Sequence, residues 1–290
     1  MSAPPLPNAF IGGAQKCGTT TLHRLLERHP QAFFPARPQE IHYFDLERNF
    51  ARGLGWYQEH FAAWDGEPVV AQTSPLYLYA PEVAARAQAL VPEARWLFLL
   101  RNPIDRAYSH YWHEVRYGWE KLSFEQALAA EPERLQGGEE ARRHFSYLDR
   151  GRYGRQLARF VECFGRERLL VATYDELVAD PLALARRAAT FLGLPAEELR
   201  SEEAAEKNHN PAMRPRFPAL QRLLRPWRRV PGLARLVDGF NLVEARYPPM
   251  DPATRERLRA GFAPEAEALR SLVGLEVGPW FAARGAEARP

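Results

Sequence analysis

The chain has 290 residues, of which 46% are hydrophobic and 26% charged, and its net charge is +3. These values are ordinary for a globular protein and allow one large α/β domain or two small ones. No apolar run approaches the roughly 20 residues of a membrane span, and so weak a charge does not indicate nucleic-acid binding. We therefore expect no membrane span and no nucleic-acid partner.

The amino-terminal segment and the cysteines bear on location. Residues 1–10 contain no lysine or arginine and no long apolar region, so we expect no signal peptide. Cys17 and Cys163 are too few for a disulfide framework. The sequence therefore predicts a protein of the reducing cytoplasm.

Short apolar stretches bounded by helix breakers predict four strands in the first two thirds of the chain. They are Asn8–Gly12, Pro68–Thr73, Trp96–Arg101 and Arg168–Tyr174. Helical patterns fall between and after them, at Thr19–His29, Pro81–Leu90, Ile104–Tyr117, Tyr153–Cys163 and Pro181–Leu192. Strands that alternate with helices predict βαβ units, and therefore an α/β fold with a central parallel sheet flanked by helices.

The last third of the chain has a different composition. From Lys207 to Arg235 there are eight basic residues, five prolines and no acidic residue. Two further helices are predicted at about Pro252–Gly261 and Pro264–Val273. Since we see no repeat and no linker, we expect a single domain over residues 1–290, with residues 207–250 as a basic helical flap over the nucleotide site.

The stretch "FIGGAQKCGTTTL" (residues 10–22) has the form of an anion-binding loop. A short strand runs into glycines and a lysine, and a helix then begins. The first backbone N–H groups of a helix have no partner within it, and the helix dipole adds positive potential there. The predicted anion ligands are Lys16, Cys17, Gly18, Thr19, Thr20 and Thr21.

This loop departs from the ATP-binding pattern G-x-x-x-x-G-K-[ST]. Gly13 and Gly18 have the right spacing, but Thr19 stands where the lysine should be. The lysine is Lys16, one of only three in the chain, and its compact point charge suits a bound anion. A P-loop nucleotide kinase or other NTPase is therefore the alternative and not the first choice.

A second candidate site is "RNPIDRAYSHYW" (residues 101–112). Arg101 ends a predicted strand, and Ser109 lies two turns into the helix that follows. In this arrangement the two side chains can hold one phosphate together. An NTPase would more usually place a magnesium-binding aspartate at the end of this strand. The sequence therefore predicts two anion sites without a metal, as a nucleotide with 5′ and 3′ phosphates requires.

"AQKCGTTTL" and "RNPIDRAYSHYW" together resemble the two nucleotide motifs of sulfotransferases that use 3′-phosphoadenosine 5′-phosphosulfate (PAPS). The resemblance is closest to the bacterial and heparan-sulfate-type branch and extends through "ERLLVATYDELVADPLALARRAATFLGL". It implies a P-loop-NTPase-like three-layer fold. It also implies sulfuryl transfer to a hydroxyl or amine of a carbohydrate, lipid or small molecule, with 3′-phosphoadenosine 5′-phosphate (PAP) as product and no metal.

The resemblance also implies roles for single residues. Lys16 contacts the phosphosulfate bridge, and Arg101 and Ser109 hold the 3′-phosphate. The family's general base is a glutamate in K-E-x-H-[FY]-F, and "PQEIHYFD" places that role on Glu40. Gln39 replaces the lysine usual in the animal enzymes.

His42 is the rival catalytic base. If this segment were a strand, His42 would share a face with Glu40. We favour Glu40 as the base and leave His42 a catalytic or substrate-binding role. The alternative for Glu40 is a surface ion pair with Arg37 or Arg48.

The segment "AQTSPLYLY" (residues 71–79) departs from the family pattern. Gln72 stands at the position of a common glutamate, and Thr73 at that of a lysine important in some members. Either catalysis depends more on Lys16 and Glu40, or the acceptor pocket differs from that of the family. These two residues also leave open a non-catalytic relic that only binds PAPS or PAP. Tyr77 and Tyr79 are expected either to line the acceptor site or simply to pack.

In the basic flap, Arg214 and Arg216 are candidates for the nucleotide phosphates, and a P-R-x element favours Arg216. The alternative is a solvated run of charge. A further alternative is contact with a polyanionic acceptor through Arg222, Arg225, Arg228 and Arg229. The segments Asp45–Gly66 and Trp119–Ser146 are expected to be loops that set acceptor specificity.

Overall fold

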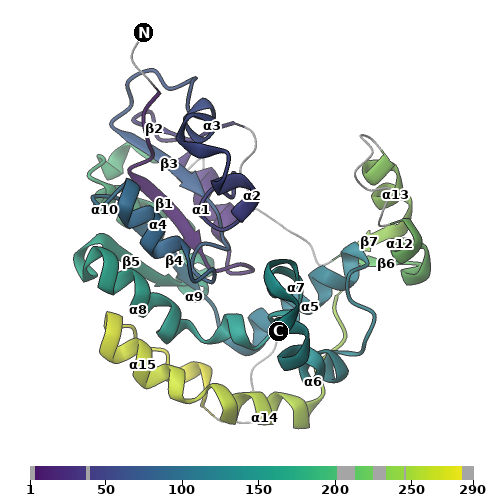
Figure 1. Cartoon of the computed structure of the whole chain (residues 1–290). Helices are drawn as coiled ribbons and strands as arrows, with labels where there is room; N and C mark the ends of the chain where they lie inside the picture. Colours follow the sequence, from purple (N-terminus) through teal and green to yellow (C-terminus); the bar gives the residue numbers. More distant parts are fainter. Residues whose placement is uncertain (1–3, 37–39, 201–212, 225–232, 245, 283–290) are drawn as a thin grey trace. The chain divides into compact units, whose positions relative to one another are not determined.

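The computed structural model describes residues 4–36, 40–200, 213–224, 233–244 and 246–282 (Figure 1). It divides the chain into two compact units. Unit 1 comprises Met1–Arg101, Tyr153–Asn208 and Pro264–Pro290, and unit 2 comprises Asn102–Arg152 and His209–Ala263. The expectation of a single domain over residues 1–290 stays a prediction.

Unit 1 contains a five-stranded sheet in which every strand pairing is parallel. Its order is β2-β3-β1-β4-β5. The strands are β1 (Ala9–Gly13), β2 (Ala32–Phe33), β3 (Val69–Thr73), β4 (Arg95–Leu100) and β5 (Leu169–Thr173). Four of them confirm the predicted strands to within one or two residues. The edge strand β2 was not predicted, because two residues carry no periodic signal.

Helices cover both faces of this sheet (Figure 1). On one face α1 (Thr19–Leu26) packs against α10 (Pro181–Leu192). On the other face α8 (Tyr153–Phe164) packs against α4 (Val83–Leu90) and α15 (Pro264–Val273). The predicted three-layer α/β fold is thereby confirmed.

The core of unit 1 is built on β4. Trp96 through Leu100 are each at most 1% exposed, as expected for an apolar central strand covered on both faces. Trp96 stacks on Phe10 of β1 with ring centroids 4.4 Å apart, and its edge meets Phe160 of α8 at 4.8 Å. This packing holds β1 and β4 as one rigid platform.

The strand order determines where a ligand can bind. β1 lies in the middle, and the chain continues to β2 and β3 on one side and to β4 and β5 on the other. In parallel α/β sheets, ligands bind beyond the carboxyl ends of the strands at such a reversal. The segments that leave these ends begin at Ala14, Ser74 and Arg101.

Unit 2 is mainly helical and is organised around α5 (Pro103–Tyr117). Asn102 caps α5 by accepting a hydrogen bond from the N–H of Ile104, and Pro103 occupies the first helical position. Against α5 pack β6, α12 and α14. The remaining elements are α6 (Phe124–Arg134), α7 (Gly138–Phe145), α12 (Pro218–Leu224), α13 (Leu233–Asn241), α14 (Pro252–Phe262) and the antiparallel pair β6 (Met213–Pro215) and β7 (Leu242–Glu244).

Helices α14 and α15 confirm the two helices predicted near the carboxyl end. The predicted flap is described only in part, as β6, α12, α13 and β7. Lys207, Arg225, Arg228 and Arg229 lie outside the described residues. Short 3-10 helices lie at Leu135–Gly137, Asp149–Gly151, Arg166–Arg168, Ala196–Glu198 and Gly278–Trp280.

The expectation that Asp45–Gly66 and Trp119–Ser146 are loops is wrong. The first contains α2 (Glu47–Phe50) and α3 (Gly53–Glu59), and the second contains α6 and α7. A reciprocal capping box between Ser123 and Gln126 starts α6, whose buried positions then recur at helical spacing. Charged and aromatic residues obscured this pattern in the sequence.

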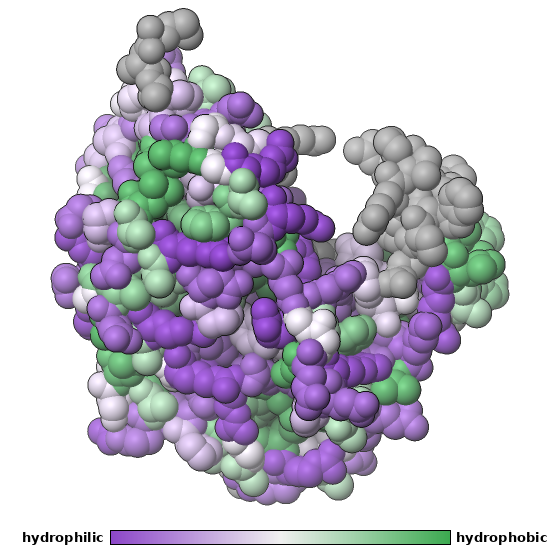
Figure 2. All heavy atoms as spheres, in the orientation of Figure 1, coloured by the Kyte–Doolittle hydropathy of each residue, from purple (hydrophilic) through white to green (hydrophobic). Residues whose placement is uncertain are grey.

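Among the described residues, no helix is long and apolar enough to cross a membrane. Figure 2 shows hydrophilic residues over most of the face that is drawn, with smaller hydrophobic patches between them.

Candidate functional site

The segment that leaves β1 is held tightly against the sheet. The Ala14 N–H donates to the carbonyl of Leu99 on β4 (2.7 Å), and the Cys17 N–H donates back to the Ala14 carbonyl (3.2 Å). Gly18 then caps α1 in the left-handed conformation, with φ of 87°. The loop from Ala14 to Gly18 is thus a compact turn at the carboxyl end of the central strand.

The first turn of α1 leaves three backbone donors for a ligand. The N–H groups of Gly18, Thr19 and Thr20 have no acceptor among the residues that the structure describes, whereas that of Thr21 donates to the Gly18 carbonyl (3.0 Å). The Cys17 N–H donates to the Ala14 carbonyl in this structure, and its predicted role at the anion stays a prediction. An anion-binding role for the other three groups agrees with this geometry.

Gly18 is needed for two separate reasons. Its positive φ is unfavourable for other residues, and a Cβ atom there would lie 2.4 Å from Leu177 Cδ2 and 3.1 Å from Tyr174 Cδ2. Both contacts come from α9 (Tyr174–Ala179), which follows β5. The glycine therefore allows α9 to approach the loop closely.

Cys17 is fully buried beneath the loop. Its Sγ lies 3.7 Å from the Gln15 carbonyl and 4.0 Å from the Tyr153 hydroxyl. That hydroxyl donates to the Arg101 carbonyl at the end of β4 (2.9 Å). The side chain of Cys17 thus packs the loop against the neighbouring strand end and is not presented to a ligand.

Three side chains of the Glu40 segment form a chain of polar contacts. His42 Nε2 lies 3.1 Å from Glu40 Oε2, and His42 Nδ1 lies 2.8 Å from Asp45 Oδ2. The side chain of Asp45 is 2% exposed and that of Glu40 is 43% exposed. The imidazole therefore links a buried carboxylate to one that solvent or a substrate can reach.

The conformation of this segment differs from the expected strand. Residues 40–46 are not a strand: His42 has φ of 54° and leads into a turn at residues 43–45. The side-chain amide of Asn49 donates to the carbonyls of Ile41 and His42, each at 3.1 Å, and holds the turn in place. The side chains of Glu40 and His42 come into contact because the backbone of His42 is left-handed. The expectation that they share one face of a strand is therefore wrong. Asp45 was missed, although its His-x-x-Asp spacing was visible in the sequence.

The two catalytic candidates Lys16 and His42 share a conformational property. They are the only non-glycine residues with positive φ in the described part of the chain, at 71° and 54°. This conformation costs energy for residues with a Cβ atom and is concentrated at functional sites. It therefore supports a functional role for both residues.

Gln72 has a buried structural role next to this segment. Its side-chain oxygen accepts a hydrogen bond from the Tyr57 hydroxyl, and its amide donates to Ser74 Oγ (3.1 Å) and to the Tyr77 hydroxyl (2.9 Å). The Tyr77 hydroxyl also accepts from the N–H groups of Tyr43 (3.2 Å) and Phe44 (3.4 Å). Burial raises the pKa of Tyr77, so this phenol stays neutral. The network ties the end of β3 to the turn that carries His42.

Tyr77 is fully buried and Tyr79 is 9% exposed. Of the two roles considered for these tyrosines, the structure favours packing over lining an acceptor site.

The side chain of Thr73 contacts a buried histidine. Its Oγ1 lies 2.8 Å from Nδ1 of His23 on α1, and the His23 ring meets Phe34 edge-on with centroids 4.7 Å apart. Burial, and secondarily the charge of Arg24, lowers the pKa of His23 from 6.5 to about 4. The imidazole is therefore neutral at physiological pH.

His23 predicts a pH dependence of stability. Because the pKa of His23 is lower in the folded state than in the unfolded state, the neutral ring contributes fully to folding stability above pH 6.5. That stability is lost as the pH falls from 6.5 towards 4. The expected loss is on the order of 3 kcal/mol in the free energy of unfolding. Urea denaturation of wild type and His23→Gln between these pH values tests it, with His113→Gln as control. Parallel curves for wild type and His23→Gln would contradict the prediction.

Arg101 and Ser109 fall in different units. Arg101 ends unit 1, where its guanidinium lies over the Tyr174 ring, 4.7 Å from the centroid. Ser109 lies in unit 2, half-buried on α5. Their joint role at a 3′-phosphate stays a prediction.

The two flap arginines differ in their contacts. The guanidinium of Arg214 lies over Trp112 of α5, 5.0 Å from its ring, and Trp112 in turn stacks on Tyr247. Arg216 is exposed, and its N–H donates to the Asn241 carbonyl (2.7 Å). The role of Arg216 as a phosphate ligand stays a prediction.

No group of three or more histidine, cysteine, aspartate and glutamate side chains suited to a metal ion occurs among the described residues.

Comparison with known proteins identifies the family. A family model described as the sulfotransferase domain matches residues 6–214 of the 290. The chain belongs to the sulfotransferase family. The matched span includes Lys16, Glu40, Arg101 and Ser109 and ends before Arg216. The family predicted from the sequence is thereby confirmed.

Heparan sulfate sulfotransferases are among the similar proteins. Mouse heparan sulfate glucosamine 3-O-sulfotransferase 5 is 30% identical over 195 residues, which cover 66% of this chain and 54% of the mouse protein. Human bifunctional heparan sulfate N-deacetylase/N-sulfotransferase 3 is 29% identical over 198 residues, covering 65% of this chain and 22% of that protein. The chain thus spans about half the length of the first of these relatives and less of the second.

A solved bacterial structure matches over a greater length. The sulfotransferase from Alicyclobacillus acidocaldarius has 30% sequence identity and a TM-score of 0.71, covering 95% of this chain and 99% of that one. This likeness supports both the family and the three-layer fold.

Proposed function

We propose that this chain transfers a sulfuryl group from PAPS to a hydroxyl or amine of an acceptor. One observation carries the proposal. Unit 1 of this sulfotransferase family member contains both an anion-binding loop with Lys16 and the linked side chains of Glu40, His42 and Asp45. Sulfuryl transfer needs these two things, namely positive potential for the leaving phosphate and a base for the acceptor.

On the acceptor side, Glu40 takes the proton of the attacking group. Its carboxylate is exposed enough to meet a substrate and is oriented by His42 at 3.1 Å. Asp45 fixes the His42 ring through Nδ1 and stabilises positive charge on it. His42 thus fixes the position of the base, and the proton taken from the acceptor stays on Glu40.

On the donor side, Lys16 and the N–H groups of Gly18, Thr19 and Thr20 stabilise the charge that develops on the leaving 5′-phosphate. Such donors are most effective when they are fixed before the reaction, as they are at the start of α1. A sulfuryl group carries less negative charge than a phosphoryl group, so the proposed reaction does not require a metal ion.

The 3′-phosphate distinguishes PAPS from ordinary nucleotides. We assign it to Arg101, whose guanidinium is held at the end of β4 by the Tyr174 ring. Ser109 and Arg216 keep the phosphate-binding roles that the sequence indicates. We also propose a cytoplasmic location, which the free thiols of Cys17 and Cys163 support.

The test is calorimetric binding of PAP, ADP and 5′-AMP in the presence of EDTA. We expect metal-free binding of PAP at least about tenfold tighter than binding of the other two, because a charge-assisted phosphate contact contributes about 1.5–3 kcal/mol. Arg101→Ala should remove this preference and leave 5′-AMP binding unchanged. Arg270→Ala, an exposed arginine of α15, is the control.

Two outcomes would contradict the proposal. Binding that requires magnesium would favour the kinase alternative. Equal affinity for PAP and ADP would remove the donor assignment. PAP binding with no turnover on any acceptor would instead indicate the non-catalytic relic.

A further inference from the structure

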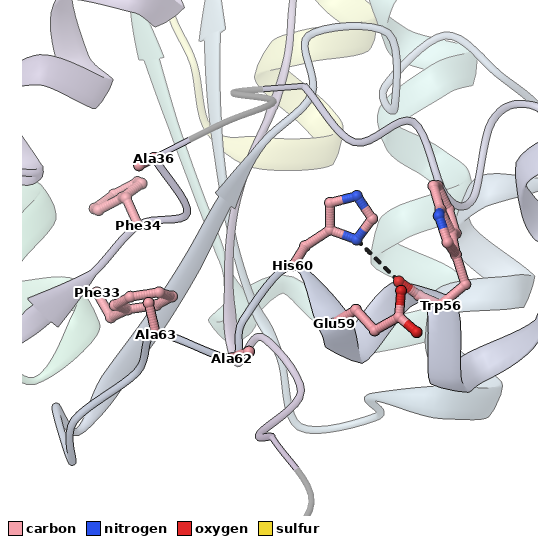
Figure 3. Close-up of a pocket in the computed structure, with 8 residues that line it drawn as sticks. All are labelled: Phe33, Phe34, Ala36, Trp56, Glu59, His60, Ala62 and Ala63. Atoms are coloured by element: carbon pink, nitrogen blue, oxygen red, sulfur yellow. Dashed lines mark hydrogen bonds between the residues drawn. The ribbon is translucent and has the colours of Figure 1, made fainter.

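A second cavity lies in unit 1, between β2 and α3 (Figure 3). It is open to the surface and has a volume of about 450 Å³, which is within the range of small-ligand sites. Figure 3 shows Phe33, Phe34 and Ala36 on one side and Trp56 and Glu59 on the other, with the His60 ring between them.

This cavity is distinct from the site described above. Phe33 pairs with Val70 near the start of β3, three residues before Thr73 at its carboxyl end. Three residues of a strand correspond to about 10 Å. A ligand in the cavity therefore lies to the side of the strand ends, where Lys16 is found, and on the same unit.

Two of the aromatic walls are held by neighbouring side chains, and the third has no ring partner in the described part of the chain. Phe34 is 7% exposed and is held by His23, and Trp56 is held by the Arg52 guanidinium, 4.3 Å from its ring. Phe33 is half-buried and has no ring or cation partner among the residues that the structure describes. Fixed rings bind the apolar face of a ligand at little cost in conformational entropy.

The polar groups of the cavity are hydrogen-bond acceptors. His60 Nδ1 lies 2.9 Å from the Trp56 carbonyl and 3.3 Å from the Tyr57 carbonyl. Since carbonyl groups only accept, Nδ1 carries a proton, and Nε2 is the acceptor atom of this tautomer. The Glu59 carboxylate has no hydrogen bond or ion pair within the described part of the chain. The cavity therefore combines ring faces with two acceptors that need donors.

We propose that this cavity binds an uncharged sugar residue of the acceptor, remote from the group that is sulfated. Sugar hydroxyls donate to Glu59 and His60, while the C–H face of the ring lies on Phe33. The inference rests on the proposed function. It narrows the acceptor of the sulfuryl group to a saccharide that is uncharged at the end away from the sulfated position. Binding of such a remote part is used to align the reacting group.

Other occupants fit less well. An alkyl chain would offer no donor to the exposed Glu59 carboxylate or to Nε2 of the half-buried His60, whereas a sugar hydroxyl can donate to each. A sulfated or carboxylated sugar would meet the negative charge of Glu59. The polyanionic acceptor considered for the flap arginines is therefore not the ligand of this cavity.

The test uses the full chain saturated with PAP. Cellotriose, maltotriose and N-acetylchitotriose serve as neutral probes, trigalacturonate as the anionic probe and octanol as the apolar one. We expect at least one neutral trisaccharide to bind at millimolar concentration. Trigalacturonate should bind at least about tenfold more weakly, because its carboxylates meet the like charge of Glu59. Binding is measured by saturation-transfer NMR and calorimetry.

Three variants assign the binding to the cavity. Phe33→Ala removes the free ring, and Ala63→Trp fills the cavity from an exposed position without touching the core. Each should weaken trisaccharide binding about tenfold or more, equivalent to about 1.4 kcal/mol, while PAP affinity stays the same. Glu59→Gln should reduce the discrimination against trigalacturonate. Trp64→Ala, which removes a 37% exposed ring outside the cavity, is the control.

The outcomes separate the two proposals. If PAP binds but no neutral trisaccharide does, or if Ala63→Trp leaves saccharide binding intact, the inference about the cavity is wrong and the donor assignment stands. If octanol or trigalacturonate binds in its place and is displaced by Ala63→Trp, the sugar assignment is wrong. If PAP itself does not bind, the proposed function fails first.

Discussion

Glu40→Gln is expected to abolish turnover while PAP affinity stays within about twofold of wild type. The variant keeps the size and polarity of the side chain but cannot take a proton at the reaction pH. General-base catalysis contributes about 10²–10⁴-fold, so the rate should fall by at least that amount. The measurement is the single-turnover rate with PAPS, together with PAP binding by calorimetry.

His42 and Asp45 give graded controls for the same experiment. If Glu40 is the base, His42→Gln and Asp45→Asn remove only its positioning, and we expect losses of about 10–100-fold, as for supporting residues around a reactive group. If His42 is the base, His42→Gln should instead be as severe as Glu40→Gln. The two assignments therefore predict opposite rank orders of the variants.

Glu162→Gln is the matched control for the substitution itself. Glu162 is an exposed glutamate of α8 in the same unit and is not part of the proposed site. Its variant should have wild-type turnover. If Glu40→Gln retains more than about a tenth of the wild-type rate, the assignment of Glu40 as base is wrong, because a base contributes more than that.

The parts of the fold that follow from local pattern were predictable. The apolar run of β4, the strand–glycine–helix transition at Gly18 and the proline at the first position of α5 each depend on a few consecutive residues. The P-loop-like sheet follows from them, because alternating strands and helices can pack in few ways. The family then assigned roles to residues inside these same segments.

The features that the sequence did not predict depend on contacts between distant segments. The turn at His42 is left-handed, so no rule of alternation places Glu40 and His42 together. The role of Gln72 became visible only with its partners Tyr57 and Tyr77, which come from other parts of the chain. The cavity between β2 and α3 likewise joins residues more than twenty positions apart, on elements that the sequence did not indicate.

The boundary between the two units was also not visible. The chain first passes from unit 1 to unit 2 between Arg101 and Asn102, where β4 ends and the cap of α5 begins. Composition marks a boundary when a polar or proline-rich linker joins two bodies, and here the motif itself crosses it. A continuous motif therefore predicted one site where the structure describes two units.

Lys16→Ala is expected to lower the rate of sulfuryl transfer about 10²–10³-fold, the usual effect of removing one preorganised donor to a developing negative charge. Lys16 lies in the turn between β1 and α1 with φ of 71°, so its backbone is fixed in an unfavourable conformation that few residues adopt. Because the charge on the leaving phosphate increases as the bond breaks, the loss should be larger in rate than in PAPS affinity.

Lys121 offers a matched control. It is an exposed lysine of unit 2, and Lys121→Ala should leave both rate and affinity unchanged. Lys16→Arg separates charge from geometry, because guanidinium keeps the charge but not the compact shape of an ammonium group. We expect Lys16→Arg to recover PAP binding and only a small part of the rate. If Lys16→Ala weakens PAPS binding and the rate equally, Lys16 binds the ground state alone, and the stabilisation of the leaving phosphate belongs to the N–H groups of Gly18, Thr19 and Thr20.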